Sequence, residues 1–342
     1  MAGRCIGSLA APRKKSCARY RCSESARMID DLIGLLSRMT GLPPSAVRRI
    51  ILSAPRRYKV YYIDKRSGGK REIAHPAREL KLLQRAFLDA VLEDLPVHVS
   101  ATAYIKGKSL KDNALPHVGA GPILKMDFRD FFPSIRAKDW IAYAREHRVF
   151  SNDHDAELSA LLLFRRPKGE SVLRLSVGAP TSPALSNILM YNFDQAVWAS
   201  VGERFVTYTR YADDMTFSAA RTGFLQGVQT RVSAIIREMS YPKLELNHQK
   251  TRFVTEKYHR DVTGLTLSLD NRVTIGQLRK RNIRAGLHQA KLGQLSREEL
   301  QTLSGHIAFA ADIEPEYIGK MKERYGEDLL DWITKGRQSD DR

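Results

Sequence analysis

The sequence predicts an α+β fold, because its helical and strand-like segments are grouped along the chain instead of alternating as they do in a doubly wound sheet. Helices come first, a hairpin and several strands with interposed helices follow, and the last segments are helical again. The length of 342 residues suits two structural units or one multi-lobed domain. We divide the chain into a basic mobile tail at 1–23, helices at 24–54, a mixed α and β region at 55–274 and a helical region at 275–342.

The first predicted elements are helices and a hairpin. Apolar residues recur at helical spacing over 25–39, and Gly41–Pro44 ends that helix. A second helix covers 45–52. Alternating residues from Tyr58 onward predict a strand that turns at the glycines and returns through 73–76. Basic residues surround the tip of this hairpin.

The middle and end of the chain supply the remaining elements. The stretch 79–92 is predicted to be helical, and 122–128 to be a buried strand with an acidic residue at its end. Two further strands are joined by a tight turn at Ala212–Asp214, and 261–273 is another strand region. A capping box at Ser296–Glu299 opens one of the helices that end the chain.

Composition limits the class of protein. The chain carries 56 Lys and Arg against 38 Asp and Glu, a net charge of +18, and 43% of its residues are hydrophobic. This composition excludes a disordered chain, and the excess of positive charge favours a protein that binds nucleic acid. No apolar run reaches the roughly 20 residues that cross a bilayer, so we expect no membrane partner.

The tail at 1–23 contains all three cysteines, Cys5, Cys17 and Cys22. Their spacing is uneven and no histidine lies near them, so we interpret them as incidental and not as metal ligands. The rest of the sequence has no cysteine, which excludes a disulfide framework there. Together with the lack of a signal-peptide pattern, this predicts a cytoplasmic protein.

Three carboxylates are the main candidates for chemistry. Asp213 and Asp214 lie in a turn between apolar strands, and Asp127 ends another apolar strand. Carboxylates gathered at the end of a buried sheet repel one another unless divalent cations neutralise them, and oxygen ligands suit Mg²⁺. Two such ions can support phosphoryl transfer. An acidic turn that simply ends a hairpin is the alternative for the adjacent pair alone.

The surroundings of these acids resemble a known family. Four segments, Asp127–Ile135, Gly178–Asn187, Tyr211–Ser218 and Leu246–Thr251, resemble four consecutive motifs of reverse transcriptases. They occur in the family's order, and the similarity extends over most of the chain. The resemblance implies a right-hand polymerase fold with fingers and palm at 55–274 and a helical thumb at 275–342.

Two shorter elements resemble the bacterial retron branch of that family. Asn113–His117 matches an Asn-Ala-x-x-His element, and Val262–Gly264 matches a Val-Thr-Gly element. The resemblance implies RNA-directed synthesis of multicopy single-stranded DNA from a cognate noncoding RNA, primed by a guanosine 2′-hydroxyl. Deoxynucleoside triphosphates, an antiphage role and a separate effector protein are implied as well. Another compact reverse transcriptase and a catalytically silent RNA-binding scaffold stay open as alternatives.

The resemblance also assigns roles to residues of the catalytic motifs. Asp127, Asp213, Asp214 and the Phe128 carbonyl would hold two Mg²⁺ ions. Phe132 would be the aromatic gate that excludes a ribose 2′-hydroxyl, with core packing as the alternative. The remaining nucleotide contacts would come from Lys65, Arg71, Gly178, Ala179, Pro180 and, as proton donor or phosphate clamp, Lys250.

One position departs from the family pattern. Many relatives carry a glutamine immediately before the motif glycine, where this chain has Val177. Valine cannot donate a hydrogen bond to the nucleotide or template, so the usual nucleotide contact is in doubt.

Nucleic-acid contacts are predicted outside the catalytic motifs. A dense basic stretch opens the C-terminal helical region, where thumb cations would contact phosphates without reading sequence. A solvated helix face is the alternative. The residues expected to contact nucleic acid are Asn113, His117, Arg279, Lys280, Arg281 and Arg284.

Overall fold

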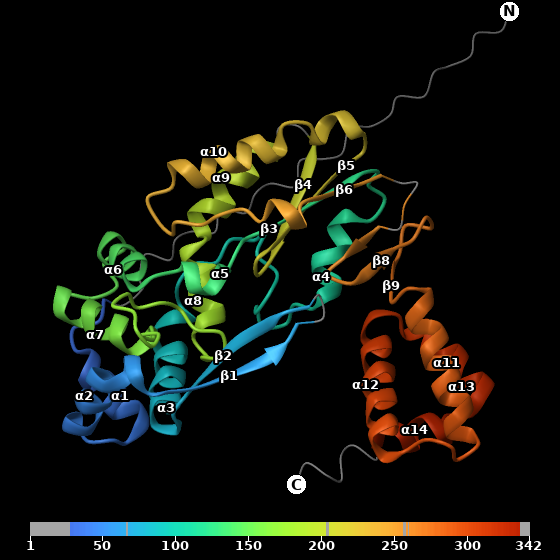
Figure 1. Ribbon diagram of the computed structural model, residues 1–342, viewed down its shortest axis with the longest axis horizontal. Coiled ribbons are helices and arrows are strands. Elements are labelled where there is room, and N and C mark those ends of the chain that lie inside the picture. Colours follow the sequence, from blue (N-terminus) through green and yellow to red (C-terminus); the bar gives the residue numbers. More distant parts are fainter. Residues whose placement is uncertain (1–27, 66–67, 203–204, 256–257, 259, 336–342) are drawn as a thin grey trace, which may run out of the picture.

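The computed structural model describes residues 28–65, 68–202, 205–255, 258 and 260–335. The tail predicted at 1–23, with its three cysteines, lies outside the described residues. Figure 1 shows the first helices at one end of an elongated molecule and the last four helices at the other. A sheet with helices packed against it lies between these two ends.

Two short helices begin the described chain. α1 (Leu32–Thr40) starts later than the helix predicted at 25–39, because Asp31 caps it by accepting a backbone hydrogen bond at 2.9 Å. α2 (Pro44–Ser53) follows, as predicted, with proline at its first position. A 3₁₀ turn at Ala54–Arg56 then leads into the first strand.

The predicted hairpin and the helix after it are both present. β1 (Tyr58–Asp64) pairs antiparallel with β2 (Lys70–Pro76). α3 (Arg78–Phe87) follows and continues as a π-helical turn at Leu88–Leu92. In Figure 1 the hairpin extends from the N-terminal helices toward the C-terminal helical region.

The central sheet has four antiparallel strands in the order β4-β5-β3-β6. Its strands are β3 (Ile123–Asp127), β4 (Val206–Tyr211), β5 (Asp214–Ala219) and β6 (Arg252–Val254). β3 and β5 occupy the middle positions and pair with each other along their length, from Ile123 opposite Ser218 to Asp127 opposite Asp214. This places the predicted acidic residues at one end of the sheet.

Helices surround this sheet and join it to the N-terminal helices. α9 packs against β4, α10 packs against α9, and α7 contacts both α2 and α6. None of the described helices has the length and apolar character to cross a bilayer. The α-helices that follow α3 and precede β6 are α4 (Leu110–Ala114), α5 (Phe131–Ser134), α6 (Ala137–Glu146), α7 (Asp153–Leu163), α8 (Ser182–Leu189), α9 (Tyr191–Gly202) and α10 (Val228–Glu238).

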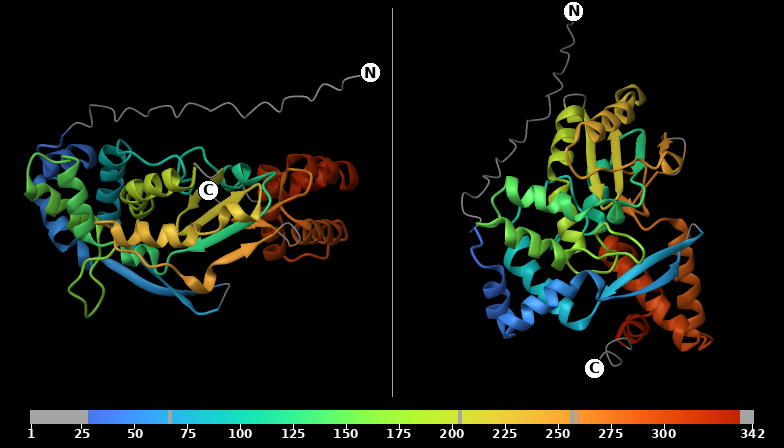
Figure 2. Two further views of the ribbon diagram at one scale, coloured as in Figure 1. Left: turned by 90° about the horizontal axis from the view of Figure 1, so that it is seen from above. Right: turned by 60° about the vertical axis from the view of Figure 1, so that its left-hand side comes forward.

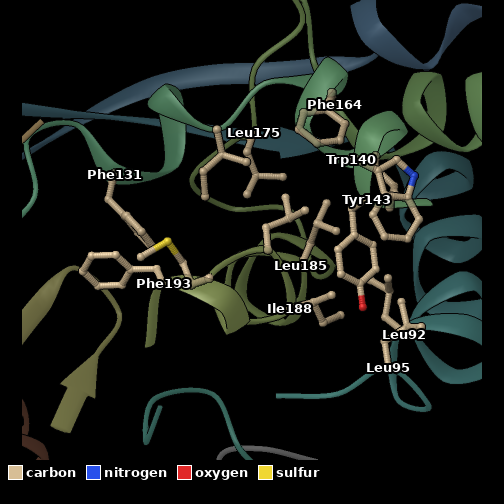
Figure 3. Packing of buried hydrophobic residues seen from close by; sticks show 14 of the residues in the cluster. Leu92, Leu95, Phe131, Trp140, Tyr143, Phe164, Leu175, Leu185, Ile188 and Phe193 are labelled. Carbon is tan, nitrogen blue, oxygen red and sulfur yellow. The ribbon is translucent and has the colours of Figure 1, made fainter. Parts of the chain in front are cut away.

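One large hydrophobic core joins the sheet to these helices. Figure 3 shows Trp140, Phe164 and Leu185, from different elements, meeting in its interior. Trp140 is fully buried, and its indole N–H donates to Ser159 Oγ at 2.8 Å. The core continues to Phe193, beside the motif that carries Asp127. Packing therefore fixes the position of that motif relative to the helices.

A second core belongs to the C-terminal part of the chain. A three-stranded antiparallel sheet connects to four helices, which Figure 2 shows gathered at one end of the molecule. The strands are β7 (Asp261–Val262), β8 (Leu265–Leu267) and β9 (Val273–Thr274). The helices are α11 (Gln277–Lys291), α12 (Arg297–Ile313), α13 (Pro315–Tyr325) and α14 (Glu327–Lys335).

Candidate active site

The strand register brings the three predicted carboxylates together. Asp127 ends β3 directly opposite Asp214, which begins β5. Asp213 occupies the turn before it, and its carbonyl accepts a hydrogen bond from the Phe128 backbone N–H at 3.3 Å. The turn depends on Ala212, whose φ of 57° is left-handed. Local turn geometry and strand pairing thus place all three acids at one end of the sheet.

The proximity of these acids changes their protonation. Burial, together with the charge of Asp127, raises the pKa of Asp213 above its ordinary value. Loss of solvation, together with the neighbouring charges of Asp213 and Asp127, raises the pKa of Asp214 to about 7. The site therefore holds more negative charge than it can stabilise without a cation.

Lys250 supplies one positive charge to this site. It lies in a short 3₁₀ turn after α10, and its Nζ donates to Asp127 Oδ2 at 2.9 Å. Burial alone would lower the pKa of Lys250, but the hydrogen bond to Asp127 and the nearby carboxylates raise it. The lysine therefore stays protonated beside the acids, as its predicted role as proton donor or phosphate clamp requires.

The carboxylates fit a divalent cation by their chemistry. Asp127 Oδ1 is buried and accepts no hydrogen bond from the part of the chain that the structure describes, which is costly for a carboxylate oxygen unless a cation approaches it. Among the described residues, no three or more His, Cys, Asp or Glu side chains already form a closed set of metal ligands. The site thus offers carboxylate oxygens that could bind a cation, but these side chains do not form a complete ligand set among the described residues.

A buried ion pair fixes the turn that carries Asp213 and Asp214. Arg210 and Asp194 are both fully buried, and the guanidinium donates to the two carboxylate oxygens at 2.8 and 2.6 Å. Arg210 also donates to the Ala212 carbonyl at 3.0 Å. Burial opposes the charge of Arg210, but Asp194 outweighs it and raises the pKa of the arginine. Arg210 therefore connects α9 to the turn that carries Asp213.

The same network reaches an aromatic cluster that the sequence analysis did not identify. Asn187 accepts from Arg210 at 3.1 Å and donates to the Ala103 carbonyl at 2.8 Å. Tyr104, which follows Ala103 in the chain, has a left-handed φ of 61°. The centroid of its ring lies 6.3 Å from that of Phe132 and 6.3 Å from that of Tyr211. No sequence motif marks Tyr104, because only the fold brings it to the catalytic turn.

Phe128 and Phe132 have different surroundings. Phe128 is buried and packs its ring against Phe131 and Phe193, so only its backbone faces the acids. Phe132 is half-buried and contacts the rings of Phe131 and Tyr104. A partly exposed ring beside the acids is consistent with the gate role, and the core packing considered as its alternative is also present in part.

The motif at Gly178, Ala179 and Pro180 is attached to the basic hairpin. The Ala74 N–H in β2 donates to the Val177 carbonyl at 2.8 Å. Gly178 has a φ of 120°, and a Cβ there would come within 3.0 Å of the Ala74 carbonyl oxygen. The glycine is therefore required for the backbone to approach β2, whereas the Val177 contact uses only a main-chain atom.

The two hairpin cations lie at different positions. Burial raises the pKa of Asp213 and of Tyr104, and Arg71 in β2 lies close enough to both for its positive charge to offset a small part of that rise. Lys65 is exposed directly after β1, where its backbone exchanges hydrogen bonds with Gly68 and Gly69. The structure thus brings Arg71 toward the acids and leaves Lys65 at the tip.

The prediction that Asn113 and His117 contact nucleic acid is wrong for this structure, because both are buried. His117 bridges Ser218 Oγ at 2.7 Å and Thr209 Oγ1 at 2.8 Å, and burial lowers its pKa to about 3. Asn113 accepts from Thr102 and donates to Thr263 at 3.4 Å. The Asn113–His117 element therefore stabilises the protein interior: His117 connects β4 to β5, and Asn113 contacts Thr263 of the second retron-like element, in the turn between β7 and β8.

Some of the basic residues of α11 contact other parts of the protein, and others are exposed to solvent. Lys280 is half-buried and forms an ion pair with Glu314 at 2.5 Å, so its contact with nucleic acid stays a prediction. Arg279 donates to the Gly264 carbonyl and stacks on Phe309. Arg281 and Arg284 are exposed, so these two remain predicted phosphate contacts.

The buried ion pair makes a stability prediction. Asp194→Asn should lower the free energy of unfolding by about 3–5 kcal/mol, because it leaves Arg210 charged and buried without a partner. Adding Arg210→Met should recover part of the loss. The control is Asp270→Asn, which removes an exposed pair with Arg272 and should cost at most about 1 kcal/mol. Equal losses in urea unfolding for the two aspartates would contradict this account.

The raised pKa of Asp214 makes a second prediction. A carboxyl group with a higher pKa in the folded chain binds more protons when folded, so stability falls as pH rises from about 4 to about 7. In metal-free protein, Asp214→Asn should therefore stabilise the chain above pH 7 and have little effect near pH 4. The exposed Asp312→Asn is the control. A stability difference that does not change with pH would refute the prediction.

Comparison with known proteins agrees with the site geometry. A family model described as reverse transcriptase (RNA-dependent DNA polymerase) matches residues 63–267. The retron Ec83 reverse transcriptase of Escherichia coli is 34% identical over 81% of this chain and 90% of its own. The retron Ec73 and Ec86 reverse transcriptases of the same organism are 32% and 31% identical, over 83% and 86% of this chain and 91% of each relative.

Among solved structures, an apo telomerase from Candida tropicalis aligns with 65% of this chain and 55% of its own, at 15% identity and a TM-score of 0.43. A likeness this distant carries no detail of the site. The family match and the named retron relatives decide the assignment. The chain belongs to the reverse transcriptases of the retron type, and it is an RNA-directed DNA polymerase with an α+β, right-hand polymerase fold.

Proposed function

We propose that this enzyme is the reverse transcriptase of a retron and copies a cognate structured noncoding RNA encoded beside its gene. Synthesis would start from the 2′-hydroxyl of a guanosine in that RNA and give branched multicopy single-stranded DNA. The similarity to several named retron enzymes over most of both chains carries this proposal. Cytoplasmic localisation, an antiphage role and a separate effector protein remain predictions from the sequence.

The proposed cofactor is a pair of Mg²⁺ ions, since the family depends on divalent metals in general. Asp127, Asp213 and Asp214 would hold them, with the Phe128 carbonyl as a further oxygen ligand. The unpartnered Asp127 Oδ1 and the raised pKa values of the other two acids support this assignment. When bound, such ions lower the pKa of the attacking hydroxyl and stabilise charge on the departing pyrophosphate.

The basic residues around the acids are assigned to the triphosphate. Lys250 is protonated and flexible enough to turn from Asp127 to the leaving phosphates, where it would donate a proton or stabilise their charge. Arg71 would contact the triphosphate from the hairpin, and Lys65 would reach it only from the tip. Gly178, Ala179 and Pro180 would form the wall beside the nucleotide.

Selection of deoxynucleotides is assigned to an aromatic pair. Phe132 would exclude a ribose 2′-hydroxyl by steric conflict, and Tyr104 would hold the Phe132 ring in place through their contact. Exposed Arg281 and Arg284 on α11 would contact the phosphates of the primer–template duplex.

Expression of the gene with its native flanking DNA tests the proposal. We expect a discrete small nucleic acid on a denaturing gel that DNase destroys and that RNase or debranching shortens. It should be absent from an Asp213→Asn, Asp214→Asn variant, because the acids can no longer hold cations. The Asp312→Asn variant, which changes an exposed acid on α12, should make the product normally.

Other outcomes separate the alternatives. If the product is absent but purified enzyme extends an ordinary primer on an RNA template, the retron assignment is wrong and another reverse transcriptase type is indicated. If neither product forms, the chain acts as an RNA-binding scaffold despite its intact carboxylates.

A further inference from the structure

A hollow lined by arginines lies far from the carboxylates. It has a volume of about 720 Å³ and is formed by α2, the 3₁₀ turn after it and the segment that follows α7. Figures 1 and 2 show α2 and α7 at the end of the molecule opposite to α11–α14. The hollow shares no lining residue with the catalytic site. Its five basic residues are Arg48, Arg49, Arg56, Arg57 and Arg166.

The local sequence explains why these arginines gather there. In α2, Val47, Ile50 and Ile51 are buried in the core, which turns Arg48 and Arg49 outward. Pro55 is buried in the next turn, and its carbonyl accepts a hydrogen bond from the Arg166 N–H at 2.8 Å. This bond fixes the segment after α7 against the turn and brings Arg166 to the same hollow.

Most of this charge has no partner within the described protein. Arg57 pairs with Glu79 at 2.7 Å, but within the described ranges no ion pair or hydrogen bond engages the guanidinium groups of Arg48, Arg49, Arg56 or Arg166. The described residues that line the hollow include no acidic residue. Gathering like charges without counter-ions is unfavourable, so the arrangement indicates a site for an anionic ligand.

The shape of the surface favours a polymer over a small anion. A second hollow of about 550 Å³ shares Arg56 and Arg57 with the first and continues past Lys59 and His75 at the start of the β1–β2 hairpin. A basic track thus spans two adjoining hollows. Guanidinium groups bind phosphates in a planar, two-pronged geometry, and Leu52 adds an exposed apolar surface for a sugar or base.

We propose that this arginine hollow binds the phosphate backbone of a folded RNA segment outside the template–primer duplex. The enzyme family already requires an RNA ligand, and a structured RNA that enters the cleft would extend beyond it. The inference depends on RNA-directed activity alone and not on a cognate RNA or a branched product. The hollow would anchor RNA without reading its sequence, because phosphate contacts carry no base information.

A triple variant, Arg48→Gln, Arg49→Gln and Arg166→Gln, tests the inference. Two probes are compared: a short RNA–DNA primer–template that fits the catalytic cleft, and the same duplex extended by an RNA stem-loop. We expect affinity for the extended probe to fall about tenfold or more and the slope of log affinity against log salt to shrink by about 2. Affinity for, and extension of, the short probe should stay within about twofold.

Two controls exclude a general effect of charge or folding. The matched triple variant Lys138→Gln, Arg237→Gln and Lys320→Gln removes three exposed cations from α6, α10 and α13 and should bind both probes normally. Replacing the three hollow arginines by lysine keeps the charge and should restore part of the affinity. Thermal unfolding checks that every variant is folded.

The inference is overturned if the hollow variant binds the extended probe like the parent, or loses affinity equally for both probes. It is also overturned if the matched control loses as much affinity. Absence of a branched product in cells would leave these binding results unaffected, so failure of the proposed retron function is distinguishable from failure of this inference.

Discussion

The buried ion pair between Arg210 and Asp194 holds in place the turn that carries Asp213 and Asp214. Two buried charges are stable only when they pair with each other and make further hydrogen bonds. Here Tyr208 donates to Asp194, and Arg210 donates to Asn187 and to the Ala212 carbonyl. Because Arg210 immediately precedes the turn, these bonds set the backbone path that presents Asp213 and Asp214. The helix that carries Asp194, the α8 helix that carries Asn187 and the central sheet are thereby locked together.

That rigid support allows an arrangement that is unfavourable in itself. Three carboxylates meet at the end of β3 and β5, where burial and mutual repulsion raise the pKa values of Asp213 and Asp214. Lys250 offsets only part of this charge. Cations bound at these carboxylates, as proposed, would relieve the repulsion, so the packing that crowds the acids would favour metal binding.

The sequence predicted the elements whose signal is local. The α+β class, the hairpin, the catalytic strands and the three acids followed from short patterns in which neighbouring residues carry the information. It failed where the direction of a side chain depends on tertiary packing. His117 and Asn113 lie in a polar, basic part of the sequence, yet the fold turns both into the protein to bond Ser218, Thr209 and Thr263. Lys280 belongs to a run of cations, yet it forms an ion pair with Glu314, which lies between α12 and α13.

Tyr104 and the arginine hollow were missed for a related reason. Tyr104 has a left-handed backbone conformation, and Asn187 of α8 donates a hydrogen bond to the carbonyl of the preceding Ala103. The position of Tyr104 beside the site therefore cannot be predicted from residue spacing along the chain. The arginines come from α2 and from a segment more than 100 residues later, so only the packing of α7 on α2 reveals them as one site.

Anomalous X-ray scattering from crystals of the enzyme soaked with Mn²⁺ and an RNA–DNA primer–template tests the central claim most directly. The account predicts anomalous peaks within coordination distance of Asp127, Asp213 and Asp214, and their loss in Asp213→Asn, Asp214→Asn crystals. A cleft that contains primer–template but shows no peak beside these three carboxylates, or peaks that survive in the variant, would contradict it.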